Sequence, residues 1–307
     1  MKLWVVTDGM PGMQNQALGL AEALGHDITV KKVTTRPPWK YVTPFVRLGL
    51  KYSFTGDPLT PPWPDVVIAS GRKSIMPALY VKRASQGKTK VIYIQNPVIS
   101  PDHFTAVVVP EHDRLKAENV FVTQGALHRV TEARLEAERA KFSPFISEFS
   151  APRIAVILGG TNRTYHFTPD VAYKLGQRLK QLKTSLLITP SRRTDPKSLA
   201  VLSETLQGTK TYIWDGTGDN PYFAFLAWAD AILVTCDSVS MISEARATSK
   251  PVYMIQLPGG DAKFKRFHDH WIEKGYVKWF EGDVDFASEN PLNEMHTLAQ
   301  KIKKMIR

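Results

Sequence analysis

Short apolar runs of strand length alternate with helical patterns along the whole chain. In the first half, the runs that predict strands are 3–7, 28–33, 65–69, 91–95 and 106–109. A second series of the same kind follows at 154–158, 185–189, 211–214, 231–235 and 252–255. Continuous apolar strands separated by helices are typical of parallel sheets covered on both faces. The pattern therefore predicts an α/β protein.

Helix signals lie between many of these runs. Apolar periodicity predicts helices over 14–24 and 74–84, and a last helical pattern covers 292–306. In the second half, helix starts are marked by a capping residue before a proline at the first helical position: Thr168-Pro169, Asp195-Pro196 and Asn220-Pro221.

The chain also shows a boundary between its two series of strands. A charged helical stretch, 131–141, leads into a proline-containing stretch and then the second series. We expect a hinge near 145–152, a first Rossmann-like lobe over 1–148 and a second over 149–290. The helix in 291–307 is expected to cross back onto the first lobe. The predicted architecture is two similar lobes facing a central cleft.

Composition narrows the class of protein. The 307 residues are 43% hydrophobic and 22% charged, as in ordinary globular proteins. One cysteine, Cys236, excludes a disulfide framework and a cysteine-based zinc site. No H-E-x-x-H motif or Asp-rich cluster is present, so we expect no metal and no cofactor. No apolar run reaches the ~18 residues of a membrane span, and the start turns polar too early for a signal peptide, which favours a cytoplasmic protein.

The charge is unusual. Forty Lys and Arg against 29 Asp and Glu give +11, with a pI of about 9.6. This balance favours anionic partners, namely nucleic acid, a phospholipid surface or phosphorylated small molecules, and a solvated basic surface is the plain alternative.

Polar loops follow the strands of the second series, where ligands bind in open parallel sheets. Glycine lets a ligand approach the backbone, amides at a helix start attract anions, and adjacent arginines offer forked donors. Together these features predict a binding site for a diphosphate. The candidate residues are Gly159, Gly160, Thr161, Asn162, Arg163, Ser191, Arg192, Arg193, Trp214, Asp215, Gly216, Thr235, Asp237 and Ser238.

The helix after Cys236 adds a polar stripe. Ser240, Met241 and Glu244 share one face with Asp237, and a carboxylate there can accept hydrogen bonds from ribose hydroxyls. Plainer roles exist for each candidate: a turn for the glycines, a solvated loop for the arginines, a helix cap for Asp237 and an ordinary ion pair for Glu244. The phosphate-binding patterns G-x-x-x-x-G-K-[ST] and G-x-G-x-x-G are absent, which disfavours a nucleoside triphosphatase and a dinucleotide oxidoreductase.

In the first half, Asp8 ends the first strand and is either a general base or a turn residue. His112 and Asp113 either pair for proton transfer or are structural. The segment 39–52 interleaves basic residues with aromatic and aliphatic ones at helical spacing, which suits either a surface dipping into an anionic bilayer or a helix packed on its own lobe. Nucleic acid is disfavoured, because the basic residues are spread along the chain and no nucleic-acid motif is visible.

Several of these motifs together resemble the mitochondrial-fission Elm family over nearly the whole chain. They are Val6-Thr7-Asp8-Gly9-x-Pro11-Gly12-x-x-Asn15-Gln16, Leu158-Gly159-Gly160-Thr161, Thr189-Pro190-Ser191-Arg192-Arg193-Thr194, Thr235-x-Asp237-Ser238-Val239-Ser240-Met241-x-Ser243-Glu244-Ala245, and Arg266-Phe267-His268 followed by Gly275. Bacterial members of that family are similar to two-lobed glycosyltransferases of the GT-B type, and more distantly the layout is similar to the peptidoglycan N-acetylglucosaminyltransferase MurG.

The resemblance implies a metal-independent glycosyltransferase with a nucleotide-sugar donor in the second lobe. It implies that Trp214–Gly216 hold the base, Gly160, Thr161 and the arginines the diphosphate, and Glu244 the ribose. In the first lobe it implies an acceptor site, while Asp8 is our candidate for the catalytic base because of its place at the end of the first strand. The acceptor candidates are Gly9, Gly12, Asn15, Gln16, Ser70, Arg72 and Asn96. Where MurG-like enzymes carry a histidine in the first glycine-rich loop, this chain has Met13, Gln14 and Asn15.

The expected activity is transfer of a sugar to a glycolipid or cell-envelope acceptor by a protein peripheral to the cytoplasmic face of an anionic membrane. A nucleotide-sugar epimerase or hydrolase on the same fold is one alternative, since it consumes the donor without an acceptor. A non-catalytic scaffold recruited to a membrane is the other.

Overall fold

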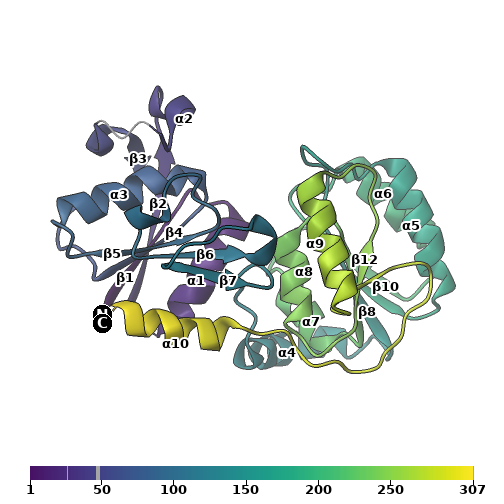
Figure 1. Ribbon diagram of the computed structural model, residues 1–307. Helices are drawn as coiled ribbons and strands as arrows, with labels where there is room; N and C mark the ends of the chain where they lie inside the picture. Colours follow the sequence, from purple (N-terminus) through teal and green to yellow (C-terminus); the bar gives the residue numbers. More distant parts are fainter. Residues whose placement is uncertain (26, 46–48, 307) are drawn as a thin grey trace. The chain divides into compact units, whose positions relative to one another are not determined.

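The computed structural model describes residues 1–25, 27–45 and 49–306, and the chain divides into two compact units (Figure 1). The first comprises Met1–Arg129 and Asn293–Arg307, and the second comprises Val130–Leu292. Each unit contains one sheet of mainly parallel strands with helices packed on it. This confirms the predicted α/β class with two Rossmann-like domains.

The first unit holds a seven-stranded sheet of order β3-β2-β1-β4-β5-β6-β7, parallel throughout except between β2 and β3. Its strands are β1 Lys2–Thr7, β2 Asp27–Thr35, β3 Phe54–Gly56, β4 Val66–Ser70, β5 Lys90–Ile94, β6 Ala106–Pro110 and β7 Val120–Thr123. Its helices are α1 Pro11–Leu24, α2 Trp39–Val42, α3 Ile75–Ala84 and α10 Met295–Ile306, with 3-10 turns at Leu50–Tyr52, Arg72–Ser74, Pro101–His103 and Glu111–Asp113.

The second unit holds a six-stranded parallel sheet of order β10-β9-β8-β11-β12-β13. Its strands are β8 Arg153–Leu158, β9 Ser185–Pro190, β10 Thr211–Ile213, β11 Ala231–Thr235, β12 Val252–Ile255 and β13 Lys278–Trp279. Its helices are α4 Glu132–Ile146, α5 Pro169–Gln181, α6 Pro196–Thr205, α7 Tyr222–Trp228, α8 Val239–Arg246 and α9 Ala262–Glu273.

Side chains alternate across the first sheet and bury both faces. On β1, Leu3 and Val5 pack with α1 and α10 on one face, whereas Trp4 and Val6 pack with α3 on the other. Figure 1 shows α10, the last helix of the chain, lying beside α1. The apolar runs are continuous because both faces are covered.

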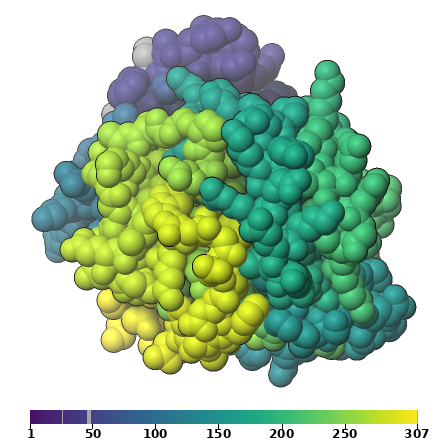
Figure 2. Space-filling model, turned by 90° about the vertical axis from the view of Figure 1, so that its right-hand side faces the viewer, coloured from purple at the N-terminus to yellow at the C-terminus, as the bar shows by residue number. Residues whose placement is uncertain are grey.

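The division between the units differs from the predicted boundary between residues 148 and 149. Helix α4 belongs to the second unit, because Arg139 Nη2 donates to Ala227 O at 2.8 Å and Trp228 Nε1 donates to Arg139 O at 3.0 Å. The connection from β13 to α10 also lies on the second unit, and Leu292 N donates to Arg246 O at 3.0 Å. Figure 2 shows it in yellow against that unit's surface.

Two local predictions are corrected. Helix α7 begins at Tyr222 rather than Pro221, since Asn220 Oδ1 accepts from Tyr222 N at 2.9 Å and Pro221 occupies the cap position. The segment 39–52 is not one helix in its described part. It contains the single turn α2 and the 3-10 turn at Leu50–Tyr52, and Val46, Arg47 and Leu48 lie outside the described residues.

Candidate functional site

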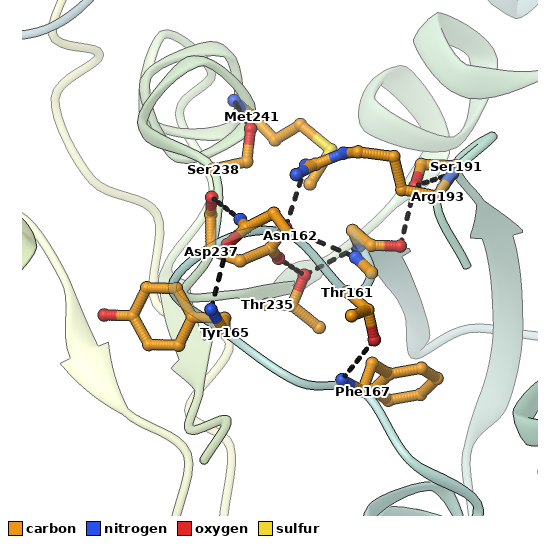
Figure 3. Close-up of polar contacts among 12 residues, drawn as sticks. Thr161, Asn162, Tyr165, Phe167, Ser191, Arg193, Thr235, Asp237, Ser238 and Met241 are labelled. Carbon is orange, nitrogen blue, oxygen red and sulfur yellow. Dashed lines mark hydrogen bonds and ion pairs between the residues drawn. The ribbon is translucent and has the colours of Figure 1, made fainter. Parts of the chain in front are cut away.

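Three polar loops gather at the carboxyl end of the second sheet (Figure 3). They follow β8, β9 and β11, which are neighbours in the strand order, so parallel pairing brings their ends together. This is the edge at which open parallel sheets bind ligands. The sequence-predicted donor residues of these loops therefore share one edge.

Asp237 links the three loops. The residue is 3% exposed, and its carboxylate accepts hydrogen bonds from Thr235 Oγ1 at 2.6 Å, Gly160 N at 3.2 Å and Arg193 Nη2 at 2.8 Å. Thr235 Oγ1 in turn accepts from Gly159 N at 2.7 Å. Burial raises the pKa of Asp237, and the Thr235 hydrogen bond and the Arg193 charge act against that rise.

The two glycines after β8 are required by packing within the protein. A Cβ on Gly159 would lie 2.0 Å from Asp237 Oδ1, and a Cβ on Gly160 would lie 2.1 Å from Arg193 O. Sequence reasoning assigned their backbone freedom to ligand approach. The structure shows that the neighbouring loops, at Asp237 and Arg193, pack directly against the backbone of these two glycines.

The loop after β9 is fixed on the loop after β8. Ser191 N donates to Leu158 O at 2.8 Å, Ser191 Oγ donates to Gly159 O at 2.6 Å, and the Thr194 hydroxyl also donates to Gly159 O. These hydrogen bonds fix the peptide backbone of Ser191–Thr194 at the sheet edge.

Three predicted arginines have different environments there. Arg193 forms the ion pair with Asp237. Arg192 and Arg163 are exposed, and within the described part of the chain no side chain pairs with either guanidinium. Arg192 and Arg163 thus keep all their donors for an anion at this edge.

Thr161 and Asn162 shape the loop that carries Arg163. Asn162 Oδ1 accepts from Thr164 N at 2.7 Å and from Tyr165 N at 2.9 Å, and its Nδ2 donates to Asp237 O at 3.5 Å. Thr161 Oγ1 accepts from Phe167 N at 3.1 Å. Figure 3 shows both side chains turned into the loop network.

Helix α8 places the predicted stripe. Ser238 caps the helix by accepting from Met241 N at 3.4 Å, and Ser240 is half-buried in the first turn. Glu244 is buried and accepts from the Tyr222 hydroxyl at 2.5 Å. Burial and, secondarily, the Glu244 charge raise the pKa of Tyr222. The carboxylate proposed for ribose therefore already holds one donor, a tyrosine that sequence reasoning did not identify.

The Trp214–Gly216 segment forms a tight turn after β10. Trp214 Nε1 donates to Thr217 O at 2.8 Å, and Asp215 Oδ1 accepts from Thr217 N at 2.9 Å. Gly216 has a φ of 90°, a left-handed conformation that favours glycine. Strand β10 pairs with β9, so this turn lies at the same sheet edge, next to the loop that carries Arg192.

A buried histidine lies behind the β11 loop and was absent from the predicted site. His268 Nε2 donates to Cys236 O at 2.9 Å, and burial lowers the pKa of the imidazole. The Arg266-Phe267-His268 motif, one of those on which the family resemblance rests, contains this histidine. Its contact is with backbone, so His268 supports the loop that presents Asp237.

In the first unit, Asp8 adopts the predicted turn role and adds an ion pair. Its Oδ1 accepts from Met10 N at 3.1 Å, and its Oδ2 lies 3.0 Å from Lys73 Nζ. Gly9, with a φ of 81°, completes the turn, and its N donates to Thr7 Oγ1 at 3.1 Å. Lys73 directly follows Arg72 in the predicted loop but was not singled out.

Met13 occupies the space where β4 and β5 end. Ser70 Oγ and Gln95 Nε2 both donate to its sulfur, at 3.6 and 2.8 Å. Asn96 Oδ1 accepts from Val98 N at 2.9 Å and so closes a turn. Within α1, which packs beside these loops, Gly12 is exposed, Asn15 is half-buried and Gln16 is buried.

Two further predictions of the first unit have structural surroundings. Arg72 Nε donates to Thr43 O at 2.8 Å, and Nη2 donates to the same oxygen. His112 Nε2 lies 3.8 Å from Asp113 Oδ1, with both side chains nearly buried. In residues 1–25, 27–45 and 49–306, no group of three His, Cys, Asp or Glu could hold a metal ion, and no helix is long and apolar enough to cross a bilayer.

Comparison with known proteins identifies the relatives of the chain. The family described as "Mitochondrial fission ELM1" matches residues 11–306. Mitochondrial fission protein ELM1 of Arabidopsis thaliana is 31% identical over 271 residues, covering 78% of this chain and 64% of that protein, so the chain spans less than two thirds of the plant relative. Uncharacterized protein RP120 of Rickettsia prowazekii is 27% identical over 99% of this chain and 98% of its own length.

Solved structures share the fold at low identity. An S. aureus MnaA–UDP structure has a TM-score of 0.57 at 12% identity, covering 99% of this chain and 95% of that one. Os79 from O. sativa in complex with UDP has a TM-score of 0.56 at 11% identity, covering 100% and 91%. The Methanocaldococcus jannaschii UDP-GlcNAc 2-epimerase has a TM-score of 0.56 at 13% identity, covering 99% of both chains. These likenesses establish the two-domain fold.

Proposed function

We propose that this chain, which belongs to the mitochondrial fission ELM1 family, is a glycosyltransferase that binds a nucleotide sugar at the carboxyl end of its second sheet. The observation that carries the proposal is the loop network around Asp237, which fixes the backbone of three strand ends beside Arg192 and Arg163, whose guanidinium groups pair with no side chain among the described residues. The forked donors of guanidinium groups suit a diphosphate. Three proteins of the same fold are described with UDP or UDP-GlcNAc bound, which supports that class of ligand.

In the proposed reaction, an acceptor hydroxyl held in the first unit attacks the anomeric carbon of the donor. The bond from that carbon to the diphosphate oxygen breaks, and the nucleoside diphosphate leaves with the bonding electrons. Asp8 takes the hydroxyl proton. Arg192 and Arg163 stabilise the negative charge that grows on the diphosphate. We propose a glycolipid or another envelope component as acceptor, with the protein at the cytoplasmic face of the membrane.

The first test is thermal unfolding of the purified protein against UDP, CMP, GDP, ADP and their sugar conjugates. A ligand at a hundredfold over its Kd stabilises the folded state by about 2.7 kcal/mol. We expect one nucleotide to raise the unfolding midpoint by roughly 5–10 °C, since each kcal/mol is about 2–4 °C for a domain of this size. Absence of any shift in folded protein would contradict the donor site.

Arg192 is expected to contribute to nucleotide binding and not to the stability of the folded protein. Arg192→Ala should weaken nucleotide-diphosphate binding by about 10- to 100-fold, because hydrogen bonds to charged groups contribute about 1.5–3 kcal/mol. The midpoint without ligand should stay unchanged, since Arg192 has no partner in the described chain. Isothermal titration calorimetry measures the affinity, and Arg178→Ala, an exposed arginine on α5, is the matched control. Equal affinities for wild type and Arg192→Ala would refute the diphosphate contact.

An epimerase or hydrolase remains the rival reaction, because the fold is shared with UDP-GlcNAc 2-epimerases. Incubation of the stabilising nucleotide sugar with the protein alone distinguishes the two. A transferase leaves the donor intact until an acceptor extract is added, whereas an epimerase or hydrolase converts it without one.

A further inference from the structure

Three aromatic side chains stand exposed around α2 in the first unit. Tyr41, Phe45 and Tyr52 are 75%, 63% and 64% exposed, while other aromatic residues of this unit, such as Tyr93 and Phe104, are buried. Figure 1 shows α2 projecting beyond the helices that cover the sheet. We refer to residues 36–45 and 49–52 as the aromatic tip. Its apolar surface is exposed in the described structure.

The aromatic tip is also basic, and so is the unit that bears it. Arg36, Lys40 and Lys51 lie in the tip beside the aromatic residues, and the described tip contains no Asp or Glu. Lys and Arg outnumber Asp and Glu by 20 to 10 in the first unit and by 20 to 19 in the second. Nearly all of the chain's positive excess therefore lies in the unit that carries the exposed aromatic residues.

The tip is fastened to the loop at the carboxyl end of β4. Arg72 directs Nε and Nη2 to Thr43 O, with Nε at 2.8 Å, and Arg36 N donates to Ser53 O at 2.9 Å. The next residue, Lys73, pairs with Asp8. Two consecutive residues thus connect the aromatic tip to the proposed acceptor edge, so Arg72 is a positioning residue for the tip rather than a free cation.

We propose that the aromatic tip is the surface by which the first unit docks on an anionic phospholipid bilayer. Aromatic rings favour the headgroup level of a membrane, and each nearby Lys or Arg adds attraction to anionic lipid. The exposed apolar Phe45 and Val42 fit lipid better than a nucleic-acid backbone, which offers nothing to bury them. The purpose of the docking rests on the proposed function, because it brings a lipid-linked acceptor to the edge that holds Asp8.

The experiment is co-sedimentation of the full chain with vesicles of phosphatidylcholine alone and of phosphatidylcholine with phosphatidylglycerol. Wild type should bind only the anionic vesicles. Joint replacement Tyr41→Ser, Phe45→Ser and Tyr52→Ser should lower the partition coefficient by about tenfold or more. Tyr173→Ser on α5, 50% exposed in the second unit, is the matched control and should bind like wild type.

A charge series tests the same surface without touching its aromatic residues. Lys40→Gln and Lys51→Gln should each lower binding by about fivefold at low salt, whereas Lys210→Gln, exposed on the second unit, should not. The proposal would be overturned if the wild-type protein did not bind anionic vesicles. It would also be overturned if the tip variants bound them as well as wild type does. Binding of duplex DNA that the tip variants lose in the same proportion would overturn it too.

Nucleotide-induced thermal shifts, recorded on the same samples, separate the two proposals. A nucleotide shift without vesicle binding overturns the docking surface alone. Vesicle binding that depends on the tip, with no nucleotide shift, overturns the transferase alone.

Discussion

Asp237→Ala is expected to lower the free energy of unfolding of the second unit by about 3 kcal/mol. The replacement removes the acceptor of the Thr235 hydroxyl, the Gly160 amide and the Arg193 guanidinium at once. The amide and the hydroxyl are buried, so they lose a partner that water cannot replace. Arg193 is partly exposed, and solvent compensates for the loss of its ion pair.

Thermal unfolding measures this loss. At about 2–4 °C per kcal/mol, the midpoint of the second unit should fall by roughly 6–12 °C. Asp219→Ala is the matched control, since its side chain is 72% exposed and forms an ion pair with the exposed Lys141. We expect that control to change the midpoint little, because exposed ion pairs contribute about 0–1 kcal/mol. Equal midpoints for Asp237→Ala and wild type would show that the three loops hold together without the carboxylate.

The cost of Asp237→Ala should also depend on pH in a defined direction. Burial raises the pKa of Asp237 above its ordinary value of 3.8, so the folded state binds a proton more readily than the unfolded state. The stability that this group contributes is complete below pH 3.8 and declines as the pH rises through the raised pKa. The difference between wild type and variant should therefore shrink as the pH rises above 3.8 and through the raised pKa of Asp237.

The sequence predicted the backbone of both sheets because the signals were local and strong. All ten predicted strands are present, and the central ones, such as β1, β4, β8 and β11, are continuous apolar runs that are buried along most or all of their length. The unpredicted strands β3, β7 and β13 contain two to four residues each and all lie at sheet edges, where short, partly exposed segments give a weak pattern. The division between the units lies before α4 rather than after it, because Leu135 and Ile146 of this largely charged helix pack in the second core.

The candidate site was predictable in position and less so in detail. Strand-end loops identified the sheet edge, because parallel topology brings them together whatever their contacts. Adjacent residues in one loop could not be told apart from sequence: Arg193 pairs with a carboxylate 44 positions away, and Arg192 with none in the described chain. Likewise, the hydroxyl that meets Glu244 comes from Tyr222 on another helix. Such contacts depend on how helices pack on the sheet, and no local pattern encodes them.

Asp8→Asn is expected to lower turnover by about 10²- to 10⁴-fold while leaving nucleotide affinity unchanged. The amide keeps a carbonyl oxygen for Met10 N, so the turn after β1 is retained, but the group can no longer accept the proton of the acceptor hydroxyl. The affinity for the nucleotide should be unchanged because the proposed nucleotide-binding site lies in the second unit, whereas Asp8 lies in the first.

Turnover is measured as release of nucleoside diphosphate from the stabilising nucleotide sugar, with an extract of envelope lipids as acceptor. Asp65→Asn is the matched control, because Asp65 Oδ2 accepts from Lys2 N at 2.7 Å, a backbone contact of the same kind at the opposite end of β1. A structural loss would lower the thermal midpoint and turnover together, whereas loss of the base lowers turnover alone. If Asp8→Asn and Asp65→Asn turn over equally, the role of Asp8 is structural, in the turn and in the ion pair with Lys73, and the base must be sought elsewhere at the acceptor edge.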